Sequence, residues 1–313
     1  MTEMILTTSA DLSTSANGPA RRFLDHWLSN LGSDRTRETY GQGLREWMDF
    51  TSSGSVEDGV ALLFTLGPMK ANALVYDFRR SLVEKDVAPS TVNARLTAIR
   101  SLVKHASALG VIGWTLNVPG LKIESYRDTT GPGRRAVRAA VETLQDRGDA
   151  KGKRDVAIVR LLHDLALRRG EVIRLDVEDL DLEAGTVAII GKGRTEKVRY
   201  TLPDPTKAAL ADWMEARGPE PGPLFTNFNR AGRRGRLSPR AVNYIMEKLS
   251  KEIGATLRPH GLRHTSITQA LDATNGDVRA VQKFSRHRDL RTLTIYDDNR
   301  QDFHGQVARL VAV

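Results

Sequence analysis

The chain has 313 residues, 40% of them hydrophobic, and a formal net charge of +9. This length predicts two domains with buried cores. No stretch approaches 18 consecutive apolar residues, so no transmembrane helix is predicted. The absence of cysteine excludes disulfides and thiolate metal sites.

The excess positive charge is confined to one part of the chain. Residues 1–125 hold equal numbers of basic and acidic side chains, so the whole excess lies in residues 126–313. A basic domain favours a polyanionic partner, although a basic, solvated surface is the alternative. Residues 1–18 are polar, rich in Ser and Thr, and lack the basic-then-apolar order of a signal peptide. We expect them to form a disordered tail.

Residues 19–116 show helical spacing of apolar side chains and predict a small all-helical domain of four to five helices. Asp34 is expected to cap the second helix and Ser90 the fourth. The ranges of the four delimited helices are 19–31, 34–48, 68–85 and 89–109.

The helix expected at residues 89–109 has two distinct faces. Its apolar stripe consists of Val92, Leu96, Ile99 and Val103. A polar and basic flank lies about 100° round the helix and includes Thr97, Arg100 and Lys104. Such a helix can pack on one side and contact phosphates on the other, although a solvated face is the alternative for each flank residue.

Residues 117–133 are rich in Gly and Pro, show no periodicity, and predict a linker.

Residues 134–313 form the second domain, with strands expected at 186–190 and 197–202 joined in a hairpin. Lys151-Gly152-Lys153 is expected to interrupt the helical structure between the first two helices of this domain. The helices are expected at 136–147, 155–167, 205–217, 238–253, 260–271, 278–284 and 290–296. The fold class is therefore mainly α with a small β-hairpin or sheet.

Groups suited to phosphoryl chemistry gather near the C-terminus. His260 and Arg263 are three residues apart and share a helix face. His287 and Tyr296 follow, so that two imidazoles, a guanidinium and a phenol lie within 37 residues. A guanidinium matches phosphate oxygens, an imidazole can move a proton, and a phenol can act as a nucleophile. Each group alone is more often structural, but together they indicate phosphoryl transfer onto tyrosine.

Two further groups precede this set in a fixed order. Arg168 lies in Ala-Leu-Arg-Arg-Gly-Glu, and Lys192 follows 24 residues later between two glycines. The order Arg, Lys, His-x-x-Arg, His, Tyr resembles the tyrosine recombinase family of phage integrases, Xer and Cre proteins. The resemblance covers roughly residues 18–300.

The resemblance implies an N-terminal helical, SAM-like core-binding domain and an α+β catalytic domain. It implies a site-specific DNA recombinase that cleaves and rejoins DNA through a 3′-phosphotyrosyl intermediate, without a cofactor, metal or ATP. Such an enzyme would act in the cytoplasm, associated with the nucleoid. A type IB topoisomerase-like enzyme and a catalytically silent DNA-binding regulator are the alternatives.

The resemblance assigns Arg168 and Arg263 to the non-bridging phosphate oxygens, which each could grip bidentately. Glu171 lies one helical turn after Arg168 and could orient its guanidinium. Arg169 is expected to be solvated.

Lys192 would be the general acid for the leaving 5′ oxygen, with Lys197 as the fallback candidate. His260 would accept or relay the proton of Tyr296, the nucleophile. His287 would hydrogen-bond the scissile phosphate.

The sequence departs from the family pattern at two places. Ser285-Arg286-His287 stands where Leu-Gly-His is common, and Ala166 stands where Gly is common. Arg286 adds a bulky cation that could touch DNA or restrain Tyr296. His264 is expected to be structural.

The partner implied is double-stranded DNA with inverted half-sites, bound by a homotetramer. Arg240 begins a helix that resembles the family's major-groove helix, so it joins Thr97, Arg100 and Lys104 as a candidate DNA contact. The apolar stripe after Asp302 resembles a segment that is exchanged between subunits. Folding back onto its own domain is the alternative.

Overall fold

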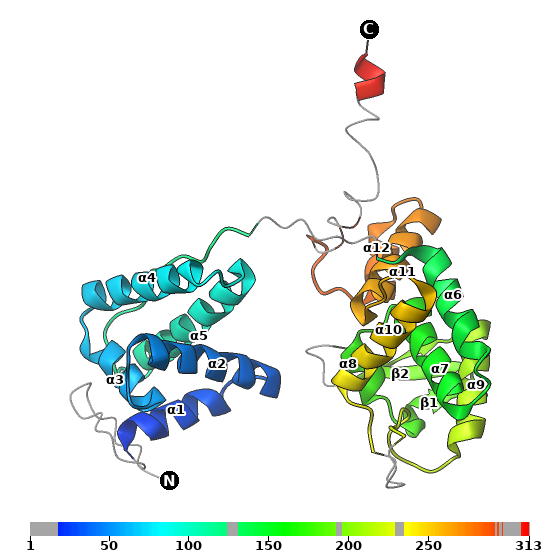
Figure 1. Cartoon of the computed structure of the whole chain (residues 1–313), viewed down its shortest axis with the longest axis horizontal. Helices are drawn as coiled ribbons and strands as arrows, with labels where there is room; N and C mark the ends of the chain where they lie inside the picture. The colour runs from blue at the N-terminus through cyan, green and yellow to red at the C-terminus, as the bar shows by residue number, and fades with distance from the viewer. Residues whose placement is uncertain are drawn as a thin grey trace. The chain divides into compact units, whose positions relative to one another are not determined.

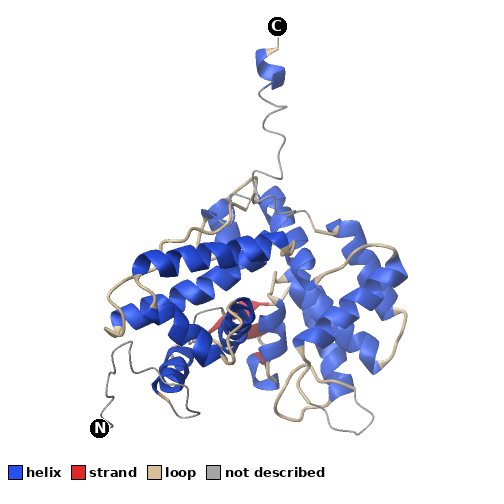
Figure 2. Cartoon of the chain, turned by 60° about the vertical axis from the view of Figure 1, so that its left-hand side comes forward, coloured by secondary structure: helices blue, strands red, loops and turns tan. Residues whose placement is uncertain are grey.

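The computed structural model describes residues 18–123, 131–191, 196–228, 235–291, 293, 296 and 308–312. The chain separates into two compact units, Met1–Ser125 and Tyr126–Val313 (Figure 1). Each unit has its own hydrophobic core. Helices dominate the described residues, and the strands form one small sheet (Figure 2). Within the described residues, no helix has both the length and the apolar character needed to cross a membrane.

The first unit is all-helical. Its helices are α1 (Pro19–Ser29), α2 (Asp34–Phe50), α3 (Val56–Thr65), α4 (Pro68–Glu84) and α5 (Pro89–Ala108). The predicted apolar stripe of α5 is fully buried, and α5 packs along α2. Trp47 fills the centre of the core, where its indole N–H donates to the Gly59 carbonyl at 2.8 Å. The helix α3 was not delimited from the sequence, because its apolar residues run almost consecutively and show little helical period.

Two predicted helix caps were wrong by one or two positions. Ser33, not Asp34, caps α2 by accepting the Thr36 N–H at 3.1 Å. Asp34 lies in the first turn, where a carboxylate favours the positive end of the helix. Ser90 does not cap α5, which begins at Pro89 and has no side-chain cap. Because proline has no N–H, it leaves one donor fewer to satisfy at the helix start.

The stretch expected to be a linker begins on the first unit. Val118 is 2% exposed and belongs to the core of that unit. The side chain of Asn93 bonds both the N–H and the carbonyl of Leu121, at 2.7 and 2.9 Å. Residues 124–130 lie outside the described residues.

The second unit combines helices with a three-stranded antiparallel sheet in the order β1-β2-β3. The strands are β1 (Leu180–Asp181), β2 (Thr186–Ile190) and β3 (Lys197–Thr201). The helices are α6 (Gly133–Gln145), α7 (Ala150–Asp164), α8 (Arg169–Arg174), α9 (Asp204–Arg217), α10 (Pro239–Ile253), α11 (Pro259–Ala273) and α12 (Val278–Ser285). Helix α7 is the central element, because α6, α9 and α11 all pack against it.

The two longer strands and the start and end of α10 agree with the sequence-based expectation. The break expected at residues 151–153 was wrong. Asp149 caps α7 by accepting the Gly152 N–H at 2.6 Å, so these residues lie in its first turn. The expected helix through Leu167 ends at Asp164 instead. The chain then turns at Ala166, whose φ of 47° lies in the left-handed region, and this turn delivers Arg168 to the start of α8.

A close backbone approach fixes the beginning of α11. Gly131 has φ +65°, and a Cβ at this position would lie 2.3 Å from the Gly261 carbonyl oxygen and 2.5 Å from the Thr265 hydroxyl. Gly133 also has a positive φ, but a Cβ there would meet nothing within 4 Å. Both glycines therefore adopt the left-handed backbone, but only Gly131 also lies too close to its neighbours to accept a Cβ.

We expect Gly131→Ala to lower the free energy of unfolding by on the order of 3 kcal/mol, because it adds a steric clash to the cost of the left-handed backbone. Gly133→Ala serves as the matched control, with an expected loss of about 1–2 kcal/mol from the backbone alone. Urea unfolding of the full chain measures both. Equal losses in the two variants would contradict the close approach.

Candidate active site

The guanidinium of Arg168 is held by a buried carboxylate. Arg168 precedes α8, and Glu171 lies in its first turn. Glu171 is 4% exposed and accepts both the backbone N–H and the Nη1–H of Arg168, each at 2.8 Å. The expected contact between these two residues is therefore present. The side chain of Arg168 keeps 28% exposure, which leaves part of the guanidinium open to a ligand.

The guanidinium of Arg263 is fully buried. Arg263 lies one turn into α11 and points inward, where its Nη1 donates to the Ala166 carbonyl. Its Nη2 contacts the Ser285 carbonyl and lies 3.2 Å from Nε2 of His287. Both terminal nitrogens are thus engaged, and the open bidentate fork expected from the sequence is not seen. In this arrangement Arg263 can act on an anionic ligand through its positive charge, but its two terminal nitrogens are not free to form a bidentate contact.

Arg263 determines the tautomer of His287. Because a guanidinium can only donate, Nε2 of His287 must accept this hydrogen bond. Its Nδ1, 2.9 Å from the Ser285 hydroxyl, then carries the proton. Burial and the charges of Arg263 and Arg168 lower the pKa of His287 from 6.5 to about 3, which agrees with a neutral ring. A hydrogen bond from Nε2 to a phosphate would require the other tautomer.

Tyr296 lies among imidazole rings. Its own ring is 3% exposed, 5.1 Å from the ring of His264 and 6.0 Å from that of His287, measured between centroids. His264 in turn lies 4.2 Å from His260, in an edge-to-face arrangement. His264, which was expected to be structural, therefore lies between the exposed His260 and the phenol ring. The signal for it was its spacing of four residues from His260, one turn along the same helix.

The described members of the predicted set converge. Burial and then the charge of Arg168 lower the pKa of Arg263 to about 9, and Tyr296 acts on the same group in the opposite direction. His287 is influenced by Arg263, Arg168 and His260. Arg168, His260, Arg263, His287 and Tyr296 thus form one electrostatic neighbourhood. Lys192 lies outside the described residues.

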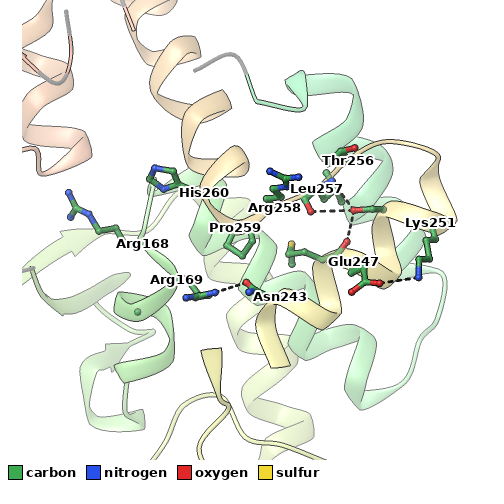
Figure 3. Close-up of a pocket in the computed structure, with 13 residues that line it drawn as sticks. Arg168, Arg169, Asn243, Glu247, Lys251, Thr256, Leu257, Arg258, Pro259 and His260 are labelled. Carbon is green, nitrogen blue, oxygen red and sulfur yellow. Dashed lines mark hydrogen bonds and ion pairs between the residues drawn. The ribbon is translucent and has the colours of Figure 1, made fainter. Parts of the chain in front are cut away.

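Two basic residues near the set have other partners. Lys197, the fallback candidate, forms an ion pair from β3 with the buried carboxylate of Asp179. Arg169, expected to be solvated, donates to the side-chain oxygen of Asn243 on α10 at 2.6 Å. Arg169 therefore points away from Arg168 (Figure 3).

A pocket of about 780 Å³ extends from this set between α8, α10 and α11. Arg168 and His260 lie at one end of it, and Glu247 and Lys251 lie at the other (Figure 3). Arg258 also lines the pocket. The opening is therefore basic near the candidate catalytic groups and can admit an anionic ligand.

The candidate DNA contacts are accessible on their respective units. On α5, Thr97 and Lys104 are exposed and Arg100 is half-buried. The Thr97 hydroxyl donates to the Asn93 carbonyl at 2.7 Å, and Nε of Arg100 donates to the Leu96 carbonyl at 3.3 Å. Arg240 is exposed in the first turn of α10, which Ser238 caps by accepting the Ala241 N–H at 3.1 Å.

Comparison with known proteins identifies the family. The model of the phage integrase family matches residues 135–302, which cover the whole converging set. The chain belongs to the phage integrase family. This tyrosine recombinase is 40% identical over 303 residues to the tyrosine recombinase slr0733 of Synechocystis sp., covering 95% of this chain and 96% of that protein. It is 29% identical over 310 residues to the tyrosine recombinase XerC of Methylobacterium nodulans, covering 94% and 92%.

Solved structures share the fold of this recombinase. The Tn1549 transposon integrase in complex with transposon right end DNA superimposes with a TM-score of 0.68 at 15% identity, covering 98% of this chain and 100% of that one. The XerH recombinase bound to palindromic difH substrate gives a TM-score of 0.63 at 18% identity, covering 87% and 78%. These matches confirm the predicted fold class, mostly helical with a small sheet.

We expect the neutral state of His287 to make the stability of the recombinase depend on pH. Because its folded pKa lies below the ordinary value, the unfolded chain binds the proton first as the pH falls. The free energy of unfolding should therefore decline from about pH 6.5 toward pH 3 and be unaffected by this group above that range. Urea unfolding at several pH values should show a shallower decline in His287→Gln. Parallel declines in the two proteins would contradict the half-buried, neutral imidazole.

Proposed function

We propose that this recombinase cleaves and rejoins specific sites in DNA through Tyr296. The phenol oxygen forms a bond to the scissile phosphorus while the bond from phosphorus to the 5′ oxygen breaks. The products are a 3′-phosphotyrosyl link and a free 5′-hydroxyl. The observation that carries the proposal is the position of the Tyr296 ring between the imidazoles of His264 and His287, beside buried Arg263.

Two guanidiniums stabilise the charge that develops on the phosphate. Arg168, oriented by Glu171 and partly exposed, is suited to hold a non-bridging oxygen directly. Arg263 contributes a positive charge from a low-dielectric interior, where charge acts more strongly than in water. Because these cations meet the charge, the proposed chemistry has no step that needs a metal. Because the ester conserves the energy of the broken bond, rejoining needs no ATP.

Proton transfer completes the reaction. The phenol proton passes to His260, and the ring of His264 lies on the path between them. Lys192 supplies the proton to the leaving 5′ oxygen, as the family resemblance implies. His287 hydrogen-bonds the phosphate once Nε2 carries a proton.

We infer that the substrate is double-stranded DNA with inverted half-sites, bound by a homotetramer. The flank of α5 with Thr97, Arg100 and Lys104 would contact phosphates, and Arg240 would enter a groove. Two of the structural neighbours were solved with DNA. Within the described residues 308–312, Leu310 is 84% exposed and Val311 69%. Apolar side chains this exposed favour docking on another subunit.

We expect Tyr296→Phe to bind its DNA site with unchanged affinity and to form no covalent adduct, because the attacking oxygen is gone while the cations remain. The measurement is trapping on a nicked suicide substrate followed by denaturing electrophoresis. Tyr76→Phe, a change to an exposed tyrosine on α4, controls for loss of a phenol elsewhere and should still form the adduct. An adduct formed by Tyr296→Phe would refute the assignment.

We expect deletion of residues 308–313 to abolish strand exchange between two sites while cleavage of a single suicide site continues. The deletion removes the exposed apolar side chains that would join subunits. Recombination of a two-site plasmid and analytical ultracentrifugation on DNA measure the two effects. Full strand exchange by the shortened chain would contradict the exchange role. Relaxation of plasmids that lack a site would instead favour the topoisomerase-like alternative.

A further inference from the structure

Arg286 adopts a backbone conformation that disfavours its own residue type. It ends α12 with φ 58° and ψ 35°, in the left-handed region. A residue with a Cβ pays roughly 1–2 kcal/mol there, and glycine does not. Its side chain is nevertheless only 8% exposed. The interactions of this side chain must therefore offset both the backbone conformation and the burial of a charge.

The guanidinium of Arg286 is held on several sides. Nη1 donates to the carbonyls of Leu165 and Phe284, at 3.0 and 2.9 Å. Nη2 donates to the Ala166 carbonyl at 2.7 Å and to Glu171 Oε2 at 3.3 Å. The guanidinium also lies over the ring of Tyr200, 5.3 Å from its centroid. These contacts join the end of α12 to the turn between α7 and α8.

Two of these acceptors are shared with Arg168 and Arg263, the two arginines proposed to neutralise the charge of the phosphate. The Ala166 carbonyl accepts from both Arg286 and Arg263. The Glu171 carboxylate accepts from both Arg286 and Arg168. Arg286 therefore links the position of Arg168 to that of Arg263 through side-chain contacts.

The turn that carries these acceptors is itself strained. Ala166 has φ 47° and is fully buried, so it also occupies the left-handed region without being glycine. Ala166 and Arg286 are the two positions at which the sequence departs from the glycines common in the family, and they touch each other. The Arg286 side chain fixes the carbonyl of the turn that Ala166 forms.

The charge of Arg286 also acts on the site. Burial lowers the pKa of Arg286, and Glu171 opposes that shift. Arg286 and Arg168 both contribute to the lowered pKa of Arg263, although its value of about 9 keeps Arg263 charged at neutral pH. Three guanidiniums therefore lie near one carboxylate, Glu171, which bonds two of them, and this leaves an excess of positive charge for an incoming phosphate.

We propose that Arg286 is a positioning residue for DNA cleavage, which holds the Ala166 carbonyl and the Glu171 carboxylate together and so sets the spacing of the Arg168 and Arg263 guanidiniums. This inference rests on the proposed function, because it acts through the two arginines that neutralise the scissile phosphate. Arg286 itself is too buried to reach the substrate. Its effect should appear in the rate of the chemical step rather than in DNA affinity.

Arg286→Gly tests the proposal, because glycine removes the side chain and suits the left-handed backbone. We expect the single-turnover cleavage rate on a suicide substrate to fall about 10- to 100-fold, as for the loss of other groups that orient catalytic residues. The dissociation constant for the DNA site should change by less than about threefold. Arg279→Ala removes an exposed arginine of the same helix and should cleave at the wild-type rate.

A substrate with a modified phosphate distinguishes a positioning role of Arg286 from a general structural defect of the variant. If Arg286 acts through charge neutralisation, replacing one non-bridging oxygen by a methyl group removes the charge that Arg168 and Arg263 must meet. The rate ratio between wild type and Arg286→Gly should then shrink toward one. A structural defect would leave this ratio unchanged. Arg286→Lys, which keeps the charge but cannot span both acceptors, should cleave at an intermediate rate.

The proposal is overturned if Arg286→Gly cleaves the normal substrate at the wild-type rate. It is also overturned if the ratio of the wild-type rate to the Arg286→Gly rate is the same on the methyl-substituted substrate as on the normal one. If Arg286→Gly does not fold by circular dichroism, Arg286→Lys decides: a slower rate at unchanged DNA affinity supports the proposal, and a wild-type rate overturns it. Tyr296→Phe is measured in parallel. An adduct formed by that variant overturns the proposed function, whereas its absence together with full cleavage by Arg286→Gly overturns this inference alone.

Discussion

The buried carboxylate of Glu171 is the interaction on which the arrangement of the site depends. Three guanidiniums crowd into a small volume between α8, α11 and α12, and like charges at this range repel each other strongly in a poorly polarisable interior. Glu171 bonds two of them directly and opposes the pKa shift of the third. Backbone carbonyls at residues 165, 166, 284 and 285 accept further hydrogen bonds from the terminal nitrogens of Arg263 and Arg286. The cations can therefore be held ready before any phosphate arrives.

The scaffold makes this preorganisation possible. Helix α7 is buried along its length, and α6, α9 and α11 pack around it. The turn that leaves α7 carries the acceptors, while α11 brings His260, Arg263 and His264 to it from one helix. A site built from the ends of packed helices keeps its geometry better than one built on a long loop. The donors contributed by one helix thus meet the acceptors contributed by another.

Much of the fold followed from local sequence patterns. The apolar stripe of α5 predicted its buried face, because helical periodicity is a strong signal in long amphipathic segments. The helix α3 lacked that signal, and the cap of α2 was placed at Asp34 instead of Ser33 because both neighbouring residue types can cap a helix start. The described catalytic candidates were found from their order and spacing, and the structure brings them together. Their burial and partners were not predictable, because they depend on carbonyls that carry no mark in the sequence.

Three local outcomes show where sequence patterns stop being informative. The inward direction of Arg263 depends on where the turn at Ala166 places its carbonyl. The place of His264 beside Tyr296 depends on a ring contact between residues 32 positions apart in the chain. The contacts of Arg286 span more than a hundred residues of chain, so no local pattern could reveal them.

The contact between Ala166 and Arg286 has a consequence for protein engineering. A hybrid enzyme assembled from two homologous parents, with its crossover anywhere between these positions, would combine one parent's turn with the other parent's helix end. A glycine-containing turn would then meet a buried arginine shaped for a different backbone, or this alanine turn would lose the group that holds it. Designers of altered-specificity hybrids should therefore inherit positions 166 and 286 from the same parent.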